Sequence, residues 1–199
     1  MSSHTLTTKQ CKNFPECFTD PLSVSRFFQP SIVTLNQTNR LFLLCLSNGN
    51  AEGLGRMREK ELEISCKALG FQEAPTCVDD PDLVDGMDSK WAPELIAEQV
   101  TRFCKQKEAT DGAISKIDII VTFDNGGVSA HPNHIALFYG VEKLMERKLL
   151  DVEVMTLTTV NIFRKYIGLA DVNFLWMDEW QCFRLNVCQA YANLARHES

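Results

Sequence analysis

The fold is decided by one stretch of the sequence, Ile117-Asp118-Ile119-Ile120-Val121-Thr122-Phe123, and by the loop after it, Asp124-Asn125-Gly126-Gly127-Val128-Ser129. A short apolar run that ends in turn residues is typical of a strand buried on both faces of a sheet. Beyond the loop, the spacing of apolar residues predicts a helix from about Pro132 to Arg147. A buried strand, a loop and a helix in this order begin a strand–helix–strand unit, so this stretch predicts a parallel sheet.

Strands and helices continue to alternate on both sides of this stretch. Further strands are predicted at Arg40 to Leu46, Thr76 to Val78, Val152 to Thr158 and Asn173 to Trp176. Helices are predicted at Arg26 to Leu35 (interrupted at Pro30), Met57 to Leu69 (ended by Gly70), Pro93 to Cys104, Asn161 to Ile167 and Gln181 to Ala195. The alternation predicts an α/β fold, Rossmann-like, in which helices flank a mostly parallel sheet with right-handed crossovers.

The composition excludes several classes of protein. The chain has 199 residues, of which 45% are hydrophobic and 23% charged, as expected of one globular domain. A net charge of −6 without a basic block argues against nucleic-acid binding through the phosphates. The sequence has neither a long apolar run nor a secretory signal, so we expect a soluble, cytosolic chain without a membrane-spanning segment. The eight cysteines form no Cys-x-x-Cys pair and are expected to be reduced and mostly buried.

Two histidines, His131 and His134, lie at the start of the predicted helix that follows the strand from Ile117 to Phe123. At a spacing of three residues, both can face one side of the first helical turn. Neutral imidazoles so placed could bind zinc, or one could bind the metal while the other acts as acid or base. The alternative is a pair that caps the helix and lies in a polar cleft. A catalytic zinc usually takes three protein ligands, so the spacing alone leaves both interpretations open.

Parallel sheets bind ligands beyond the carboxyl ends of their strands, and two loops lie there in this sequence. After Phe123, Asp124 could hold a histidine in one tautomer, or it could belong to an ordinary Asp-Asn-Gly turn. In the loop from Ser47 to Gly55 and just beyond, backbone amides could hold an anion, with charge added by Arg56 or Arg58. The alternative for the arginines is a solvated helix face. The glycine spacing in this loop differs from Gly-x-Gly-x-x-Gly, which disfavours dinucleotide binding.

Three stretches resemble a known family, the N-acetylglucosaminyl-phosphatidylinositol de-N-acetylases, within the wider group of LmbE-like zinc deacetylases. The most specific runs from Val121 to His134 and matches the family pattern VTFDxxGVSxHxNH almost position for position. Residues 44–70 match a second pattern, CxSxGN…GxxRxxEL…C..LG, and Thr156 to Tyr166 resembles a segment that ends in Arg-Lys-Tyr. The resemblance covers about residues 25–199, so we expect a loose arm at 1–24 and an LmbE-like domain at 25–199.

The resemblance implies an enzyme of glycosylphosphatidylinositol (GPI) anchor synthesis. It would hydrolyse the N-acetyl group of a membrane glycolipid, N-acetylglucosaminyl-phosphatidylinositol, at the cytoplasmic face of the endoplasmic reticulum. Members use zinc to activate a water and an aspartate as the general base. By resemblance, His134 is a zinc ligand and His131 is the catalytic histidine that stabilises the intermediate or donates a proton. Arg58 corresponds to an arginine that helps to hold the substrate, and Asp124 is a candidate to support the metal site.

One motif of the family is absent. Members carry His-Pro-Asp-Asp-Glu after an apolar first strand, and this motif supplies two zinc ligands and the general base. In this sequence Asp20-Pro21-Leu22-Ser23-Val24 stands in its place, after residues too polar for a central strand, and the chain ends inside the family's last motif. We therefore expect a sheet without its first strand, a C-terminally truncated domain, reduced stability and little or no deacetylase activity. The alternative function is that of an inactive relative that binds or regulates.

Overall fold

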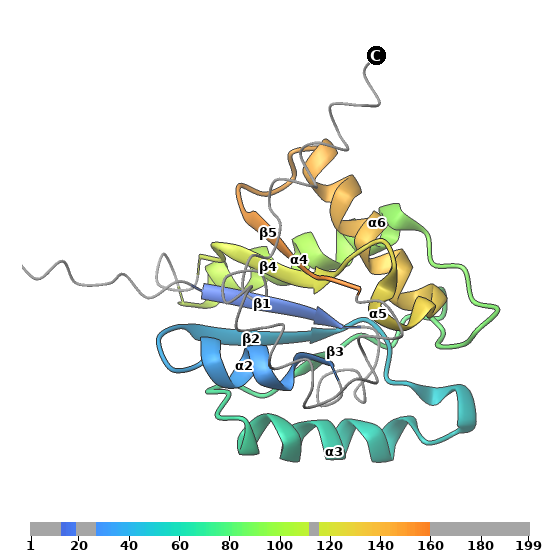
Figure 1. The fold of residues 1–199 in the computed structure, drawn as a ribbon, viewed down its shortest axis with the longest axis horizontal. Helices are drawn as coiled ribbons and strands as arrows, with labels where there is room; N and C mark the ends of the chain where they lie inside the picture. Colours follow the sequence, from blue (N-terminus) through green and yellow to red (C-terminus); the bar gives the residue numbers. More distant parts are fainter. Residues whose placement is uncertain (1–12, 19–26, 112–115, 160–199) are drawn as a thin grey trace, which may run out of the picture.

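The computed structural model describes residues 13–18, 27–111 and 116–159 of the chain. Within these ranges five strands form one sheet in the order β3-β2-β1-β4-β5, and each neighbouring pair is parallel (Figure 1). The strands are β1 (Asn13–Phe18), β2 (Arg40–Cys45), β3 (Thr76–Cys77), β4 (Ile119–Phe123) and β5 (Glu153–Leu157). The predicted α/β fold with a parallel sheet is confirmed.

Helices connect these strands, as the alternating pattern predicts. They are α2 (Gln29–Leu35), α3 (Gly55–Ala68), α4 (Pro93–Asp111), α5 (Gly127–Ala130) and α6 (Pro132–Glu146), with a short 3-10 helix, η2 (Asn50–Glu52). In Figure 1, α2 and α3 lie on the β2–β3 side of the picture, whereas α4, α5 and α6 lie on the β4–β5 side. The elements predicted beyond residue 159 lie outside the described residues.

Local signals set most of the helix ends. Gly70 stands just beyond α3 with a φ of 84°, a conformation that glycine adopts without steric cost, and so it ends this helix as predicted. Pro30 lies in the first turn of α2, where a missing N–H removes no helical hydrogen bond. The predicted interruption at Pro30 is therefore absent, because α2 begins at Gln29 and not at Arg26. Helix α4 continues to Asp111, seven residues past its predicted end at Cys104.

Strand β1 lies at the centre of the sheet, where the sequence pattern predicted no strand. All six of its residues pair in register with β2, whereas its pairing with β4 is confined to Glu16 and Val121. The expectation of a missing first strand is corrected, and β1 falls within the predicted arm at 1–24. Strand pairing uses backbone groups that almost every residue carries, so a segment without an apolar pattern can fill the space between β2 and β4. Pro15 is the exception, because it has no N–H to donate to a neighbouring strand.

The core lies on both faces of β2 and β4. Every residue of β4 is buried, as are Leu41 to Cys45 in β2, which explains why both strands are continuous apolar runs and not alternating ones. Helix α2 contributes Ile32, and Phe28 precedes it as its N-cap, while α4 and α6 contribute side chains such as Ile96 and Leu137. This packing fixes the carboxyl ends of β2 and β4, and the loops that start there, relative to one another.

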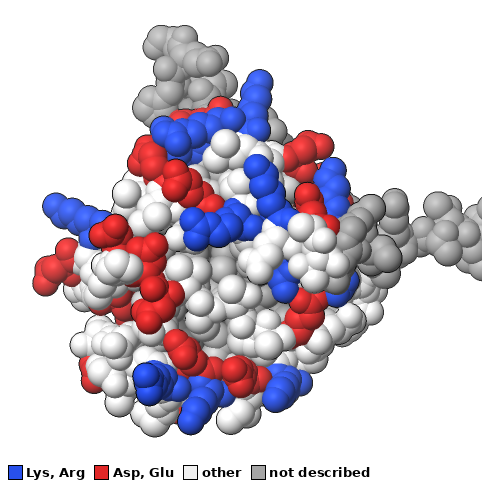
Figure 2. Space-filling view, turned by 180° about the vertical axis from the view of Figure 1, so that it is seen from behind, with Lys and Arg blue, Asp and Glu red and all other residues white. Residues whose placement is uncertain are grey.

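Charged side chains of both signs are mixed on the surface. Figure 2 shows Lys and Arg alternating with Asp and Glu around an uncharged stretch on the face seen from behind. The bottom of this view follows α3, whose exposed positions carry Arg56, Lys60 and Glu61 among others. This mixture is typical of a solvated helix face, the alternative interpretation for Arg56. No helix in the described ranges is long and apolar enough to cross a membrane.

Candidate active site

The candidate site lies where the carboxyl end of β4 meets the start of α6, at the edge of the sheet to which ligands of parallel sheets bind. The segment from Asp124 to His131 contains α5 and leads directly into α6 (Figure 1). His131 and His134 both lie in the first turn of α6 or at its cap, with ring centroids 5.1 Å apart. The structure therefore brings the two predicted histidines together on one side of the helix start.

His134 is buried, and its ring is fixed by contacts on several sides. The ring stacks on Phe123 with centroids 4.1 Å apart and packs edge-on against Phe27. Its Nδ1 lies 3.0 Å from the carbonyl oxygen of Gly127 and 3.2 Å from Oγ of Ser129. A carbonyl oxygen only accepts, so Nδ1 carries the proton and the lone pair of the neutral ring is on Nε2. Histidines that bind a metal through one ring nitrogen typically donate a hydrogen bond from the N–H of the other nitrogen, often to a carbonyl oxygen as here.

His131 has the opposite arrangement of its two ring nitrogens. Its backbone forms the N-cap of α6, and its Nδ1 accepts a hydrogen bond from the backbone N–H of Asn133 at 3.3 Å. Because Nδ1 is the acceptor, the proton of the neutral ring is on Nε2. His131 thus presents an N–H donor from Nε2, whereas His134 presents a lone pair. Capping, which the sequence offered as the alternative to a chemical role, is observed for His131 and leaves its Nε2 suited to donation.

Asp124 links the loop after β4 to Thr159, just beyond the end of β5. Its Oδ1 accepts hydrogen bonds from the N–H of Gly126 at 3.1 Å and from Oγ1 of Thr159 at 2.5 Å, and its Oδ2 accepts from the N–H of Thr159 at 2.5 Å. These contacts form the turn that the sequence offered as one alternative. Its backbone carbonyl also accepts from the N–H of Gly127, the residue whose own carbonyl holds His134. A direct contact of the carboxylate with a histidine stays a prediction.

The chain between β4 and α6 is conformationally strained. Val128 and Ala130 both have φ values of 57°, in the left-handed region that side chains with a Cβ rarely adopt. Thr159 supports this conformation, because its Oγ1 accepts a hydrogen bond from the N–H of Val128 at 2.9 Å. Residues held in such conformations cluster at functional sites, where the surrounding structure fixes them. Here they turn the chain so that His131 can cap α6.

Arg58 lies on α3 and holds the loop that follows β2. One guanidinium nitrogen donates to the carbonyl of Gly49, and the other donates to Oε2 of Glu52 at 2.6 Å. The side chain of Arg58 is only 14% exposed, whereas that of Glu52 is 68% exposed. Asn50 accepts from the N–H of Gly55 at 2.9 Å and closes the same loop. The structure thus shows Arg58 shaping the loop, and its contact with a substrate stays a prediction.

Two residues of this region were not singled out by the sequence patterns. Asn133 lies inside the histidine motif and is completely buried, and its Nδ2 donates to Oδ1 of Asp85 at 2.8 Å. Asp85 belongs to the loop after β3, 48 residues earlier in the chain. Its position after a strand of the same parallel sheet is the signal that could have indicated it, because the carboxyl ends of parallel strands share one edge.

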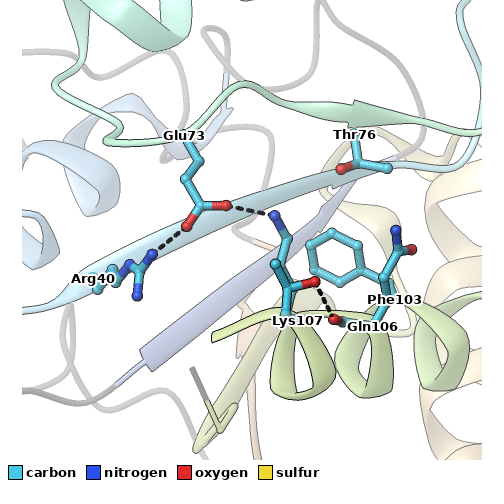
Figure 3. Close-up of a pocket in the computed structure, with 7 residues that line it drawn as sticks. Arg40, Glu73, Thr76, Phe103, Gln106 and Lys107 are labelled. Carbon is cyan, nitrogen blue, oxygen red and sulfur yellow. Dashed lines mark hydrogen bonds and ion pairs between the residues drawn. The ribbon is translucent and has the colours of Figure 1, made fainter. Parts of the chain in front are cut away.

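A separate cavity of about 310 Å³ lies beside the start of β2 and the last turns of α4, with Thr76 and Phe103 among its lining residues (Figure 3). Its charges compensate one another. Glu73 accepts from Nη2 of Arg40 at 2.5 Å and from Nζ of Lys107 at 2.6 Å. The ammonium of Lys107 also lies over the rings of Phe42 and Phe103. These contacts tie β2, the segment before β3 and α4 together, so we regard this cluster as structural.

Comparison with known sequences gives the family. The sequence model of PIG-L, described as GlcNAc-PI de-N-acetylase, matches residues 24–145, which include β2, β4 and both site histidines. The chain belongs to the GlcNAc-PI de-N-acetylase family. The family resemblance carried by the stretch from Val121 to His134 is thereby confirmed.

Three relatives with this family's name share 35–41% of the aligned residues. The probable N-acetylglucosaminyl-phosphatidylinositol de-N-acetylase of Schizosaccharomyces pombe is 41% identical over 77% of this chain and 60% of its own length. The probable enzyme of Dictyostelium discoideum is 35% identical over 73% and 65%, and the enzyme of Bos taurus is 36% identical over 76% and 58%. The chain thus spans about three fifths of the length of the curated relatives it matches.

Solved structures agree with the fold. The N,N'-diacetylchitobiose deacetylase from Pyrococcus horikoshii superposes with a TM-score of 0.57 at 14% identity, over 92% of this chain and 71% of that one. A deacetylase of the teicoplanin biosynthesis pathway superposes with a TM-score of 0.52 at 12% identity, over 73% of this chain and 66% of that one. At these identities the likeness shows a common deacetylase fold, and it confirms the predicted fold class.

The described residues can be compared with what a zinc site requires. His134 fits the role of a ligand, because its Nδ1 is occupied by the Gly127 carbonyl and its lone pair is on Nε2. In the ranges 13–18, 27–111 and 116–159, however, no three His, Cys, Asp or Glu side chains come together in a group that could hold a metal ion. The segment from Asp20 to Val24, where the family motif would stand, lies outside the described residues. The described residues alone therefore do not complete a zinc site.

Proposed function

We propose that the protein acts on N-acetylglucosaminyl-phosphatidylinositol and hydrolyses its N-acetyl group, giving acetate and glucosaminyl-phosphatidylinositol. The observation that carries the proposal is the pairing of two adjacent histidines in opposite tautomers, one with a donor and one with a lone pair on Nε2. The names of the relatives supply the substrate, and the family match includes both histidines. Because the substrate is a lipid of GPI-anchor synthesis, we place the reaction at the cytoplasmic face of the endoplasmic reticulum membrane.

The proposed reaction breaks the amide C–N bond of the acetamido group and forms a C–O bond to water. Negative charge develops on the acetyl oxygen, and the Nε2–H of His131 is a donor that can stabilise this charge. The departing nitrogen needs a proton and the attacking water loses one, so the reaction balances when that proton passes from the water to the nitrogen, and His131 donates only after its ring has taken the proton up. Capping by the Asn133 N–H and the strained segment before His131 keep its ring oriented. His131 is therefore proposed as the catalytic residue.

We propose zinc as the cofactor, with His134 as one of its ligands. A bound zinc ion lowers the pKa of a water toward neutrality. His134 suits the role because it is buried and its ring is fixed by Phe123 and Gly127. Asp124 is proposed to support it indirectly, by holding the turn that contains Gly127. Arg58 is proposed to act on the substrate through the loop that it shapes.

The segment that follows β1 limits what this chain can do. Asp20-Pro21-Leu22-Ser23-Val24 begins two residues beyond Phe18, where the family has His-Pro-Asp-Asp-Glu. Leu22 and Val24 cannot bind a metal or take a proton, and a serine hydroxyl is a poor substitute for a carboxylate. We therefore expect the 199-residue chain to show little or no turnover. The same observation favours a second candidate function, an inactive relative that binds the glycolipid or regulates.

One experiment tests the site and the missing motif together. The variant carries four substitutions, Asp20→His, Leu22→Asp, Ser23→Asp and Val24→Glu. Together they introduce the family motif His-Pro-Asp-Asp-Glu after β1. We expect this variant to retain about one zinc ion per chain, measured by elemental analysis after dialysis, and to release acetate from the glycolipid. Adding His134→Ala is expected to abolish zinc retention and turnover.

The outcomes separate the proposals. A motif-bearing variant that folds like the parent yet neither retains zinc nor releases acetate would contradict the deacetylase site. Turnover by the unmodified chain that disappears in His134→Ala would prove the expectation of inactivity wrong while supporting the function. Binding of the glycolipid in vesicles by the unmodified chain, without acetate release, would favour the second candidate.

A further inference from the structure

Asp85 and Asn133 form a buried link beside the two histidines. The Asn133 side chain is completely buried, and its Nδ2 donates to Oδ1 of Asp85 at 2.8 Å. Its Oδ1 has no hydrogen-bond partner within the described part of the chain. A carboxylate can only accept from an amide, so Asp85 fixes which end of the Asn133 amide faces the loop after β3. Asp85 is thus the polar contact that determines how this buried side chain is oriented.

Asn133 also contacts His131, through its backbone N–H. The backbone N–H of Asn133 donates to Nδ1 of His131 at 3.3 Å, and this contact keeps the ring proton on Nε2. The position of that N–H depends on the orientation of the first turn of α6. Within this turn, the buried Asn133 side chain donates the hydrogen bond to Asp85. We propose that Asp85 is a positioning residue, which acts through Asn133 to keep the Nε2–H tautomer of His131.

The loop that carries Asp85 is itself fixed on both sides. Leu83 is buried, and the indole Nε1 of Trp91 donates to the carbonyl of Val84 at 2.9 Å. Asp80, earlier in the loop, accepts from Nε2 of Gln99 on α4 at 3.0 Å. The loop that carries Asp85 is therefore held by residues that lie outside α6. A residue fixed in this way can position the helix start.

The first test reads the histidine tautomer and does not require turnover. The chain contains four histidines, so labelling histidine with ¹⁵N and comparing His→Gln variants assigns the two nitrogens of His131. In the metal-free chain at pH 8, we expect mainly the Nε2–H form of its neutral ring. Asp85→Ala is expected to lower the ratio of the two tautomers about fivefold, the equilibrium equivalent of one ordinary hydrogen bond. Asp85→Asn keeps an acceptor for Asn133 and is expected to leave the ratio nearly unchanged.

Asp88→Ala is the matched control, because it removes an exposed carboxylate from the same loop. An unchanged ratio in a folded Asp85→Ala variant, or an equal change in Asp88→Ala, would overturn the proposal. If Asp85→Ala does not fold, two variants that exchange the residues at positions 85 and 133 test the proposal instead. Asn133→Asp opposes two carboxylates and should lower the ratio, whereas Asp85→Asn combined with Asn133→Asp restores the bond with its direction reversed. A double variant no better than Asn133→Asp would also refute the role of Asp85.

The effect on catalysis rests on the proposed function and is measured separately. In the chain that carries the four motif substitutions, Asp85→Ala is expected to lower kcat about tenfold with KM within about twofold, as for residues that orient a site residue. Asp88→Ala should change neither. If the motif-bearing chain is inactive, the deacetylase function fails while the tautomer experiment still decides the role of Asp85. If that chain is active and indifferent to Asp85→Ala, the positioning role is wrong.

Discussion

Gly127 is the residue on which the orientation of His134 most directly depends. Its carbonyl accepts the hydrogen bond from Nδ1, and its φ of +59° is in the region that favours glycine. A Cβ at this position would lie 2.9 Å from Cβ of His134 and 3.1 Å from the backbone nitrogen of Ile135. The His134 ring can therefore be held in its Nδ1–H tautomer by this carbonyl only if position 127 has no side chain.

Gly127→Ala tests this dependence, with Gly53→Ala as its control. Gly53 has a φ of +75°, and a Cβ at this position would have nothing within 4 Å, so its substitution carries the backbone cost alone. That cost is about 1 kcal/mol, whereas the added overlap at Gly127 raises the loss of unfolding free energy to about 3 kcal/mol. Chemical denaturation measures both. Equal losses would mean that the structure around His134 yields easily.

The cysteines differ in the ease with which they lose a proton. Burial within α4, with a further contribution from Glu108, raises the pKa of Cys104 to about 12. A hydrogen bond from the Cys45 thiol lowers the pKa of Cys77, which is only partly buried. The thiolate is the form that reacts with alkylating reagents. We therefore expect Cys77 to react faster than Cys104 while the protein is folded.

We expect iodoacetamide at pH 8.5 to modify Cys77 at least about tenfold faster than Cys104, measured by peptide mass spectrometry. In denaturant the two rates should converge.

The raised pKa of Cys104 also makes the stability of the protein depend on pH, since the folded state keeps this thiol protonated above the ordinary pKa of 9.0. Its contribution to stability is full below pH 9 and is lost as the pH rises toward 12. Cys104→Ser should remove this part of the stability loss at alkaline pH. In the alkylation experiment, similar rates for Cys77 and Cys104 in the native protein would contradict the difference in their pKa values.

Helices α4 and α6 pack against each other so closely that Gly140 is required at their contact. Gly140 is buried, and a Cβ there would overlap both Cγ2 and Cβ of Ile96. No rotamer of Ile96 relieves the second overlap, because its Cβ is fixed by the backbone. The two helices would have to separate, and α6 carries both histidines at its start.

Gly140→Ala gives a prediction whose sign distinguishes packing from helix propensity. At an exposed helical position this change stabilises by about 1 kcal/mol, because alanine favours a helix. At Gly140 we expect a net destabilisation of about 2 kcal/mol, because overlap in a packed core outweighs propensity. Thermal and urea unfolding measure the difference from the parent chain. A stabilised variant would show that α4 and α6 do not pack as closely as described.

At the scale of the whole molecule, the sheet depends on a strand that its own sequence does not predict. Strand β1 separates β2 from β4, and these two strands carry much of the buried apolar surface. Without β1, the inner edges of β2 and β4 would have no backbone partners. The reason for expecting reduced stability, an absent first strand, therefore no longer applies. The stability of the sheet should instead depend on the residues before Thr19.

Two deletions test this dependence. Removing residues 1–18 takes away β1, and we expect the cooperative thermal transition to be lost, because the sheet divides at its centre. Removing residues 1–12 keeps all six residues of β1, and we expect the transition to persist within about 5 °C of the full chain. Circular dichroism and calorimetry measure both. A cooperative melt of the shorter chain, close to that of the longer one, would mean that β1 adds little to the fold.

Sequence patterns were enough to predict the buried strands β2 and β4, the helices α3 and α6, and the place of His131 and His134 between a strand and a helix. These features depend on local patterns. A strand covered by helices on both faces needs a continuous apolar run, and glycine and proline mark helix ends wherever the fold puts them. The specific stretch from Val121 to His134 also sufficed to indicate the family, which the comparison confirmed.

The central strand and the two histidine tautomers, in contrast, could be assigned only from the folded chain. Backbone pairing is nearly independent of sequence, so β1 could be recognised only once β2 and β4 were placed on either side of it. The tautomers follow from contacts with Gly127 and Asn133 that depend on how the chain turns after β4. The links from Asp85 to Asn133 and from Asp124 to Thr159 join residues 48 and 35 positions apart, and such contacts arise because parallel strands bring their carboxyl ends to one edge.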